Sequence, residues 1–166
     1  MAEPKLMIGL TNPKSPTNVG AVMRAAGCYG VDEVRYTGAR YERAAKFHTD
    51  THSASDAIPL TRVEELRADL PAGTKIVCIE LVEGAVALPN FDHPEQAIYL
   101  FGPEDGSLSQ QVVSAADAVV YVPTNGCMNL AATVNVLLYD RMAKSEFSQG
   151  DELVRQSRDI NNRLRC

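Results

Sequence analysis

The chain alternates short apolar runs with segments whose apolar residues recur at helical spacing, a pattern typical of proteins built from both strands and helices. Most of the runs end at turn residues such as proline, glycine or asparagine, which is how buried strands commonly end. We therefore predict strands at residues 5–10, 33–37, 75–81, 97–101 and 118–122.

Capping residues and helical spacing predict helices between and after these strands. The first helix would be capped by Thr17 or Asn18, and the second would be closed by Pro71. Residues 38–60 are polar and irregular, with one helical turn expected near Ala44. The predicted helices cover residues 18–29, 62–70, 109–115, 129–144 and 151–164, and the fourth of them is apolar almost all round.

Apolar strands that alternate with helices indicate an α/β fold with a parallel sheet covered on both faces. Ligands of such sheets bind at the carboxyl ends of the strands. The loops after Leu10, Leu81, Phe101 and Val122 are therefore the candidate site, and they hold the most unusual residues of the chain.

Composition narrows the class of protein. The 166 residues are 45% hydrophobic and 22% charged, which is ordinary for one globular domain. No apolar run approaches the roughly 20 residues that span a bilayer, and the first residues do not resemble a signal peptide. We expect a cytoplasmic protein.

Cysteine and histidine usage favours neither disulfides nor a metal. The four cysteines, Cys28, Cys78, Cys127 and Cys166, are far apart, and we expect reduced, mostly buried thiols. The pair at positions 48 and 52 has the i, i+4 spacing of metal-binding histidines, but further ligands are missing. We predict no metal.

Charge is unevenly distributed. The net charge is −5, yet residues 53–120 hold three basic and eleven acidic residues, while residues 141–166 hold six basic and four acidic ones. Such asymmetry can guide a polyanion to one face, although solvated helix surfaces give the same pattern. The candidate contacts to such a polyanion are Arg35, Arg40, Arg43 and Lys46.

Three segments carry candidate chemistry. The first opens the first predicted helix with Asn18, Gly20 and Arg24, and the arginine lies about one and a half turns into that helix. By itself this pattern also fits a capped helix with one surface arginine.

The second segment is a turn after a buried strand, where Gly102 and Gly106 bracket Glu104 and Asp105. Glycines leave room for a ligand, and carboxylates can bind a hydroxyl, an amine or a sulfonium cation. We predict no phosphate site here, because the carboxylates would repel the phosphate and no lysine follows. A plain acidic turn is the alternative.

The third segment leads from Pro123 through Cys127 and Met128 to Asn129, at the start of the long apolar helix. Backbone N–H groups at a helix start are free to bind a ligand. Asn135 lies among apolar residues in that helix and needs a partner if it is buried, which a second subunit could provide.

Together, in order and spacing, the three segments resemble the motifs of the SpoU/TrmH family, which belongs to the SPOUT superfamily of knotted methyltransferases. The segment that begins at Asn18 meets the family's N-x-G-x-x-x-R pattern, and the turn that contains Glu104 is similar to G-x-E-x-x-G with its last glycine one residue early. The segment that ends at Asn129 resembles Pro followed by Ser-Leu-Asn, with Cys127 in place of serine and a loop about three residues shorter than is common.

The resemblance implies a deep trefoil knot in about residues 75–144, within a methyltransferase domain at 1–146 that is followed by a helical extension at 147–166. It implies a homodimer with the site near the subunit interface, where Asn135 would find its partner. It also implies that S-adenosylmethionine binds in the knot loops, held by Glu80, Leu81, Gly102, Val122, Cys127 and Met128.

The implied reaction moves a methyl group from the sulfonium donor to a ribose 2′-hydroxyl of RNA. Arg24 would act on that hydroxyl, either as a base or by stabilising the developing alkoxide, and Asn18 would orient the arginine or the ribose. Glu104 and Asn129 would hold the loops and the donor. The absence of a separate RNA-binding domain favours tRNA over rRNA.

Two other interpretations stay open. One is a dimer that binds RNA or S-adenosylmethionine without catalysis, its third motif altered at Cys127. The other is an ordinary doubly wound nucleotide-binding protein, which would be expected to carry G-x-G-x-x-G after its first strand, and this chain does not.

Overall fold

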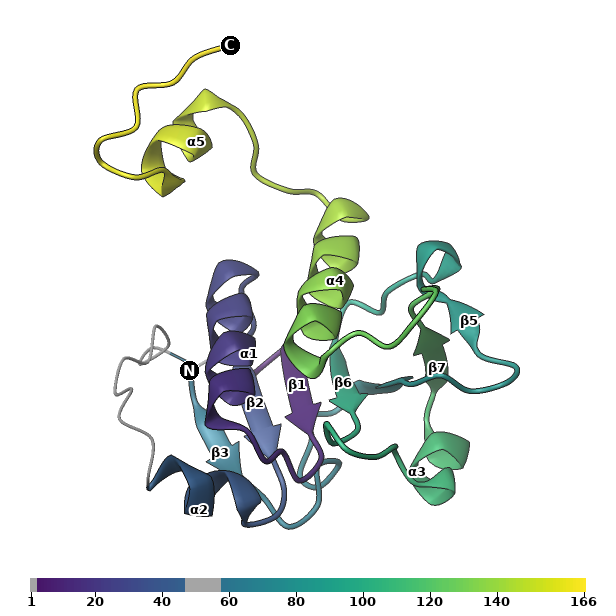
Figure 1. Cartoon of the computed structure of the whole chain (residues 1–166). Helices are drawn as coiled ribbons and strands as arrows, with labels where there is room; N and C mark the ends of the chain where they lie inside the picture. The colour runs from purple at the N-terminus through teal and green to yellow at the C-terminus, as the bar shows by residue number, and fades with distance from the viewer. Residues whose placement is uncertain (1–2, 47–57) are drawn as a thin grey trace.

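A computed structural model of the protein describes residues 3–46 and 58–166. Within them the strands form one sheet of order β3-β2-β1-β6-β4-β7-β5, in which every neighbouring pair is parallel (Figure 1). The strands are β1 Leu6–Leu10, β2 Glu33–Tyr36, β3 Leu60–Arg62, β4 Lys75–Ile79, β5 Val86–Ala87, β6 Ala97–Phe101 and β7 Ala118–Tyr121. The predicted α/β class with a parallel sheet is confirmed.

Helices cover both faces of the sheet (Figure 1). Two long helices lie side by side on one face, α1 and α4, and the short α3 lies on the other face with residues 63–70. The helices are α1 Pro16–Cys28, α2 Arg40–Ala45, α3 Gln110–Ala115, α4 Leu130–Ala143 and α5 Asp151–Ser157, with a 3-10 turn η1 at Leu88–Asn90.

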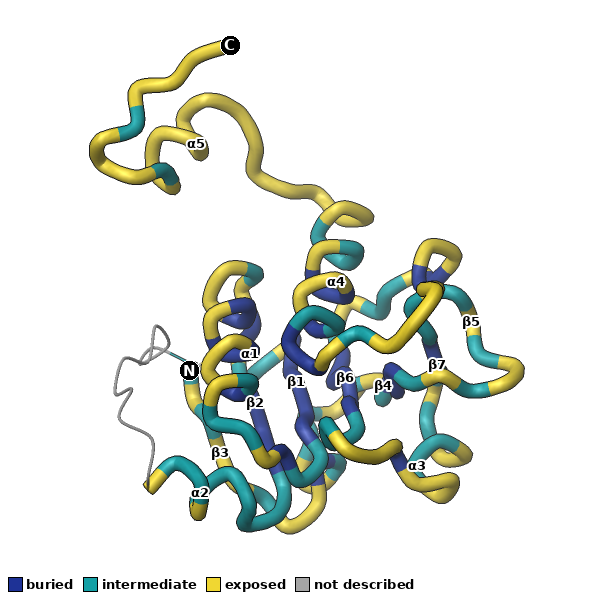
Figure 2. The backbone as a smooth tube through the Cα atoms, viewed as in Figure 1, coloured by how far each residue is buried: buried dark blue, intermediate teal, exposed yellow. Residues whose placement is uncertain are grey.

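The central strands β1 and β6 are buried at every position (Figure 2). Their side chains alternate, so that Ile8 and Tyr99 join the core under α1 and α4, whereas Met7 and Ile98 join the smaller core under α3. The continuous apolar runs of the sequence arise because both faces of these strands are covered.

All five predicted strands are present, but two short ones were not predicted. β3 has three residues and β5 has two, and each lies at an edge of the sheet. Neither is long or apolar enough to stand out from the surrounding loop. The predicted strand at 75–81 ends earlier, at Ile79.

The predicted helix at 62–70 is wrong. Arg62 ends β3, and residues 63–70 form turns. The carbonyls of Leu66 and Ala68 accept hydrogen bonds from the Arg35 guanidinium, at 3.5 and 2.6 Å, instead of from a following helical turn. Asp69 has a φ of 53°, which no α-helix contains. These turns cover the same face of the sheet as α3, and Leu66 is buried in the core on that face.

Helix ends also differ from prediction. α1 is capped by Ser15 rather than by Thr17 or Asn18, since the Ser15 hydroxyl accepts a hydrogen bond from the Asn18 amide and Pro16 occupies the first turn. α5 stops at Ser157, well before 164. Beyond it, the Asp159 and Asn162 side chains accept hydrogen bonds from nearby backbone amides, which competes with helix formation. The helical turn expected near Ala44 is confirmed as α2.

Several expectations about burial are corrected. All four cysteines are free thiols, but only Cys78 is buried. Asn135 is exposed, and its side-chain amide donates to the Ala131 carbonyl at 2.9 Å, so it needs no further partner within the chain. His48 and His52 lie outside the described residues. No helix in the described part of the chain is long and apolar enough to cross a membrane.

Candidate active site

A cavity of about 390 Å³ lies at the carboxyl ends of β4, β6 and β7, beside the start of α4. All three sequence segments contribute to its walls. The predicted site residues around it are Asn18, Glu80, Leu81, Gly102, Glu104, Val122, Cys127, Met128 and Asn129. The parallel sheet explains this convergence, because it brings the ends of these strands to one edge.

One wall of the cavity is the junction between the end of β4 and the turn after β6. The Glu80 carboxylate accepts hydrogen bonds from the backbone amides of Leu108 at 2.8 Å and Leu81 at 3.1 Å. A Cβ at Gly102 would lie 3.0 Å from the Leu108 nitrogen and 3.2 Å from the Glu80 carboxylate. The turn therefore packs closely here only because residue 102 is glycine.

The start of α4 forms another wall. Asn129 caps this helix, and its side-chain oxygen accepts a hydrogen bond from the Ala132 amide at 2.8 Å. The Thr133 hydroxyl donates to the Asn129 carbonyl at 2.9 Å, and both residues line the cavity. Asn129 thus sets the position at which the polar loop 123–128 enters the helix.

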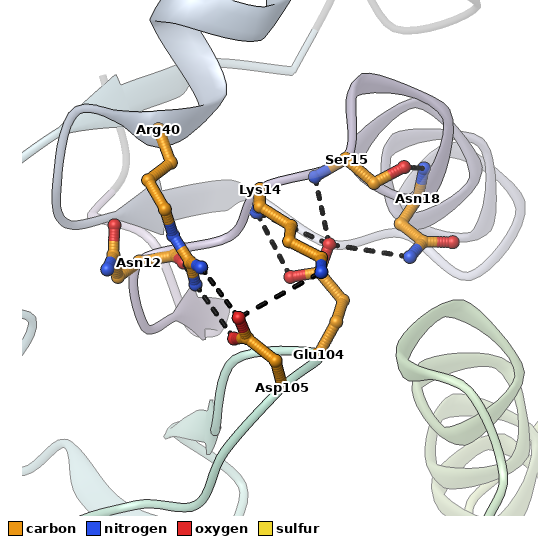
Figure 3. A network of polar contacts seen from close by, with 7 residues as sticks. All are labelled: Asn12, Lys14, Ser15, Asn18, Arg40, Glu104 and Asp105. Atoms are coloured by element: carbon orange, nitrogen blue, oxygen red, sulfur yellow. Dashed lines mark hydrogen bonds and ion pairs between the residues drawn. The ribbon is translucent and has the colours of Figure 1, made fainter.

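Glu104 connects the cavity to the loop before α1 (Figure 3). Its carboxylate accepts hydrogen bonds from the amide of Ser15 at 2.9 Å, from that of Lys14 at 3.1 and 3.3 Å, and from the Asn18 side chain at 3.4 Å. Burial by itself would raise the pKa of the Glu104 carboxyl, but these bonds and one from its own amide outweigh that effect and lower it. Glu104 is therefore ionised at neutral pH.

Arg24 is not brought into this cavity. It lies on the exposed side of α1, and it is not among the residues that line the cavity. Within residues 3–46 and 58–166 its guanidinium makes no hydrogen bond or ion pair. In a single chain, Asn18 and Arg24 thus belong to different surroundings although both lie on α1.

The four candidate RNA-contacting residues do not form one patch. Arg35 is a correction to the prediction, because it is only 8% exposed and its guanidinium binds Glu33 at 2.8 Å and the carbonyl of Ala68. Arg40 is paired with Asp105 through two hydrogen bonds. Arg43 and Lys46 are exposed on or just after α2.

Sequence reasoning missed several residues that shape the site. The amides of Lys14 and Ser15 hold Glu104, and neither residue belongs to a motif. Asp105, which the sequence presents only as part of an acidic turn, binds Arg40. Thr124 and Ser107 line the cavity. The Ser-Pro pair at 15–16, which is typical of a helix start, was the available signal for where α1 begins.

Comparison with known proteins places the chain in a family. The profile of the SpoU rRNA Methylase family matches residues 5–139. Among curated relatives, the tRNA (guanosine(18)-2'-O)-methyltransferase of Escherichia coli K12 is 24% identical over 83% of this chain and 63% of its own length. The 23S rRNA (guanosine-2'-O-)-methyltransferase of Nitrosomonas europaea is 25% identical over 92% of this chain and 62% of its own length. The chain thus spans somewhat less than two thirds of the length of these two relatives.

Solved structures share the fold. The A. aeolicus TrmH/SpoU tRNA modifying enzyme aligns with a TM-score of 0.62 and 19% identity over 82% of this chain and 73% of that one. The AviRb methyltransferase of Streptomyces viridochromogenes in complex with AdoMet aligns with a TM-score of 0.65 and 22% identity, over 85% and 58%. A structure described as giving insights into 2-OH methylation of C/U34 on tRNA aligns with a TM-score of 0.64 and 25% identity, over 82% and 93%. With the family profile matching most of its length, the chain belongs to the SpoU methylase family.

Proposed function

We propose that the protein is an S-adenosylmethionine-dependent RNA methyltransferase that modifies a ribose 2′-hydroxyl. The observation that carries the proposal is the single cavity into which all three motif segments converge. Membership of the SpoU methylase family supports the reaction. One relative is named as a tRNA 2′-O-methyltransferase and another as an rRNA 2′-O-methyltransferase.

The cavity fits the proposed donor. Its volume of about 390 Å³ lies within the range of small-molecule sites. Two carboxylates, Glu80 and Glu104, line it. Their negative charge attracts a donor with a positively charged sulfur and repels a nucleotide rich in phosphates. A related AviRb structure is described as a complex with AdoMet. When bound, S-adenosylmethionine supplies a methyl group that is already activated by its sulfonium.

The residues of this chain would then provide position and charge. Loops fixed by Gly102, Val122, Cys127 and Met128, together with Glu80 and Leu81, hold the donor mainly through backbone groups. Glu104 and Asn129 fix the turn and the helix start that line the cavity. Asn18 presents a side-chain amide to the same cavity and orients the acceptor. Such fixed positioning supplies much of a transfer rate.

We further propose a homodimer. The exposed side of α1 would contact the partner subunit, and Arg24 would contribute to a site that two subunits complete together. Two exposed apolar side chains on α4, which packs beside α1, support an interface on this face of the molecule. Val136 is 38% exposed and Tyr139 is 58% exposed. Arg24 has no partner within the described part of its own chain, so its charge is available to stabilise a developing alkoxide. An RNA phosphate or water then takes the proton, because an arginine is almost never neutral.

The knot belongs to the same proposal. The strand order puts β7 between β4 and β5, both of which precede it in the sequence, and this order is compatible with a threaded connection. We propose the knot within about residues 75–144, in a methyltransferase domain at 1–146. Residues 147–166 then form an extension, which is mostly exposed and lies away from the sheet (Figures 1 and 2).

We favour tRNA as substrate over rRNA. The relatives include enzymes of both classes, but the structure described for tRNA C/U34 methylation is covered over 93% of its length, whereas the AviRb chain is covered over 58%. The match to a structure described for tRNA methylation therefore supports tRNA as the substrate class, and we propose that the reaction takes place in the cytoplasm. Arg43 and Lys46 remain candidate phosphate contacts, because both are exposed.

The direct test is transfer of labelled methyl from S-adenosylmethionine to total tRNA and total rRNA, followed by nucleoside analysis. We expect a 2′-O-methylated nucleoside in tRNA. If only rRNA becomes labelled, the substrate is rRNA and not tRNA. If the protein binds the donor but transfers no methyl group, it is a dimer that binds without catalysis.

Arg24→Ala should leave donor binding intact and lower methyl transfer by about 100-fold or more, because the alkoxide loses its stabilising charge. Single-turnover transfer and calorimetry of donor binding measure the two effects. Arg67→Ala is the control, since Arg67 pairs with Glu65 and does not line the cavity. Full activity of the Arg24 variant would contradict its role.

Charge reversal of Arg43 and Lys46 to glutamate should weaken tRNA binding and lower its salt dependence, because each phosphate contact releases counterions. Binding measured across a salt series tests this. Unchanged affinity and slope would make the two residues part of a solvated helix surface.

A further inference from the structure

Two consecutive carboxylates on the turn after β6 point in different directions (Figure 3). Glu104 lines the cavity and holds the Lys14–Asn18 segment. Asp105 is not among the cavity-lining residues and binds Arg40 at the start of α2. The same turn is therefore held from the cavity side by one residue and from behind by the next.

The contact from behind has the geometry of a strong pair. The two terminal nitrogens of the Arg40 guanidinium donate to the two Asp105 oxygens, at 2.8 and 3.0 Å. One of these nitrogens also donates to the Asn12 carbonyl at 2.6 Å. Such a fork fixes direction as well as distance, which a lysine could not do.

Arg40 also connects three loops at the carboxyl edge of the sheet. The Asn12 amide donates to the Thr37 hydroxyl at 3.1 Å, which joins the loop after β1 to the loop after β2. A Cβ on Gly38 would lie 2.1 Å from the Asn12 side-chain oxygen, and both residues have positive φ, 80° and 42°. Close fit between these two loops thus places Arg40 where it meets Asp105.

The charges of this pair are satisfied by each other. Hydrogen bonding from Arg40 lowers the pKa of Asp105 to about 2, and the Lys14 ammonium lies 3.9 Å from the same carboxylate. Both members of the pair are therefore charged at neutral pH. A phosphate would have to break this arrangement to bind Arg40, so the geometry argues against a simple RNA contact.

We propose that Arg40 is a positioning residue for the methyl donor, acting through Asp105 to hold the turn 102–108 in the shape that lines the cavity. This rests on the proposed function for the identity of the donor. Loss of either partner frees the turn from α2, and Glu104 then holds the Lys14–Asn18 segment in a less defined position. Donor affinity falls, whereas RNA affinity does not.

The experiment compares Arg40→Ala, Asp105→Asn and the double variant with Arg67→Ala, which removes another bidentate surface pair away from the cavity. Calorimetry with S-adenosylmethionine should give a Kd about 10-fold higher for each single variant, since one well-aligned pair accounts for roughly that factor. The double variant should be no worse than either single variant. Arg67→Ala should match the wild type.

Further readouts separate positioning from other roles. The KM for the donor should rise while the kcat, the KM for RNA and the salt dependence of RNA binding stay unchanged, and Arg40→Lys should recover only part of the donor affinity. Hydrogen exchange of the Lys14, Ser15 and Leu108 amides should accelerate in Arg40→Ala even without donor.

Wild-type donor affinity in Arg40→Ala, or additive losses in the double variant, would overturn the inference and leave the proposed function standing. Weaker RNA binding with a reduced salt slope in Arg40→Ala but not in Asp105→Asn would instead make Arg40 an RNA contact. If the wild type neither binds nor uses the donor, the proposed function fails first, and unchanged amide exchange would then dismiss the positioning role as well.

Discussion

Two polar networks attach loops to opposite ends of β6, and they differ in how far they are buried. The network at the carboxyl end joins Arg40 to Asp105, whose side chains are 31% and 47% exposed. The network at the amino end is centred on His93, whose side chain is 5% exposed, and on Tyr99, which is fully buried. The first lies at the surface beside the cavity, whereas the second has a buried centre whose charged partners Asp140 and Lys144 are 19% and 31% exposed.

The buried network forms one ordered chain of hydrogen bonds. Arg141 donates to the Tyr99 hydroxyl at 3.0 Å, Tyr99 contacts His93 Nδ1 at 2.7 Å, and His93 Nε2 contacts Asp140 at 2.7 Å. Lys144 pairs with the same Asp140 carboxylate at 2.8 Å. Because a carboxylate only accepts, neutral His93 carries its proton on Nε2 and accepts from Tyr99.

The comparison indicates that similar contacts serve different ends. A buried polar group that loses its partner costs the full desolvation penalty, so the His93 network affects the free energy of unfolding. An exposed pair contributes little to stability, so the Arg40–Asp105 pair can affect function through geometry alone. Variants at the two ends should therefore separate stability from donor binding.

The largest effect is expected from His93→Ala. It leaves the Tyr99 hydroxyl and the Asp140 carboxylate without their shared partner and opens a cavity, which should cost about 3 kcal/mol of unfolding free energy. Urea unfolding measures this. Donor affinity of the folded protein should be unchanged, and a selective loss of donor binding without loss of stability would break the contrast between the two networks.

Gly102→Ala should show the opposite behaviour. Its new Cβ would lie 3.0 Å from the Leu108 nitrogen and 3.1 Å from the Ser107 carbonyl carbon, so the turn must move by a few tenths of an ångström. We expect about 10-fold weaker donor binding by calorimetry, with little change in the urea midpoint. Arg67→Ala is the control, since Arg67 pairs with Glu65 and does not line the cavity. Wild-type donor affinity in Gly102→Ala would mean that this turn does not shape the binding site.

The smallest effect concerns pH. Burial lowers the pKa of His93 below its usual 6.5, although the Asp140 hydrogen bond opposes this and the nearby Lys144 and Arg141 charges add to it. Below pH 6.5 the His93 imidazole is protonated in the unfolded chain but stays neutral in the folded chain. The free energy of unfolding therefore falls as the pH decreases towards the pKa of His93 in the folded protein. The slope from this group is at most about 1.4 kcal/mol per pH unit.

Comparing wild type with His93→Gln between pH 7 and pH 5 isolates that contribution from the other histidines. The variant should lose part of the slope of unfolding free energy against pH. Equal slopes would show that His93 does not titrate differently in the folded and unfolded protein. The Arg40–Asp105 pair should contribute nothing in this window, because the pKa of Asp105 is about 2.

Much of the site was predictable because its parts are local. Asn18, Glu104 and Asn129 each follow a buried strand or begin a helix, and a parallel sheet brings such positions to one edge. The basic residues were harder, since charge along a sequence carries no information about burial. Arg35 and Arg40 are close in sequence, yet one is inside the protein and the other is paired to a turn 65 residues away.

The sequence by itself determined the five main strands, the parallel α/β class and the segments that meet at the cavity, because continuous apolar runs and turn residues are local properties. Only the tertiary structure decided that residues 63–70 form turns, since the carbonyls of Leu66 and Ala68 accept hydrogen bonds from Arg35 on β2. It also decided that Arg40 faces Asp105 and that Arg24 faces away from the cavity. These are choices of partner between distant segments, which depend on packing and which no local pattern specifies.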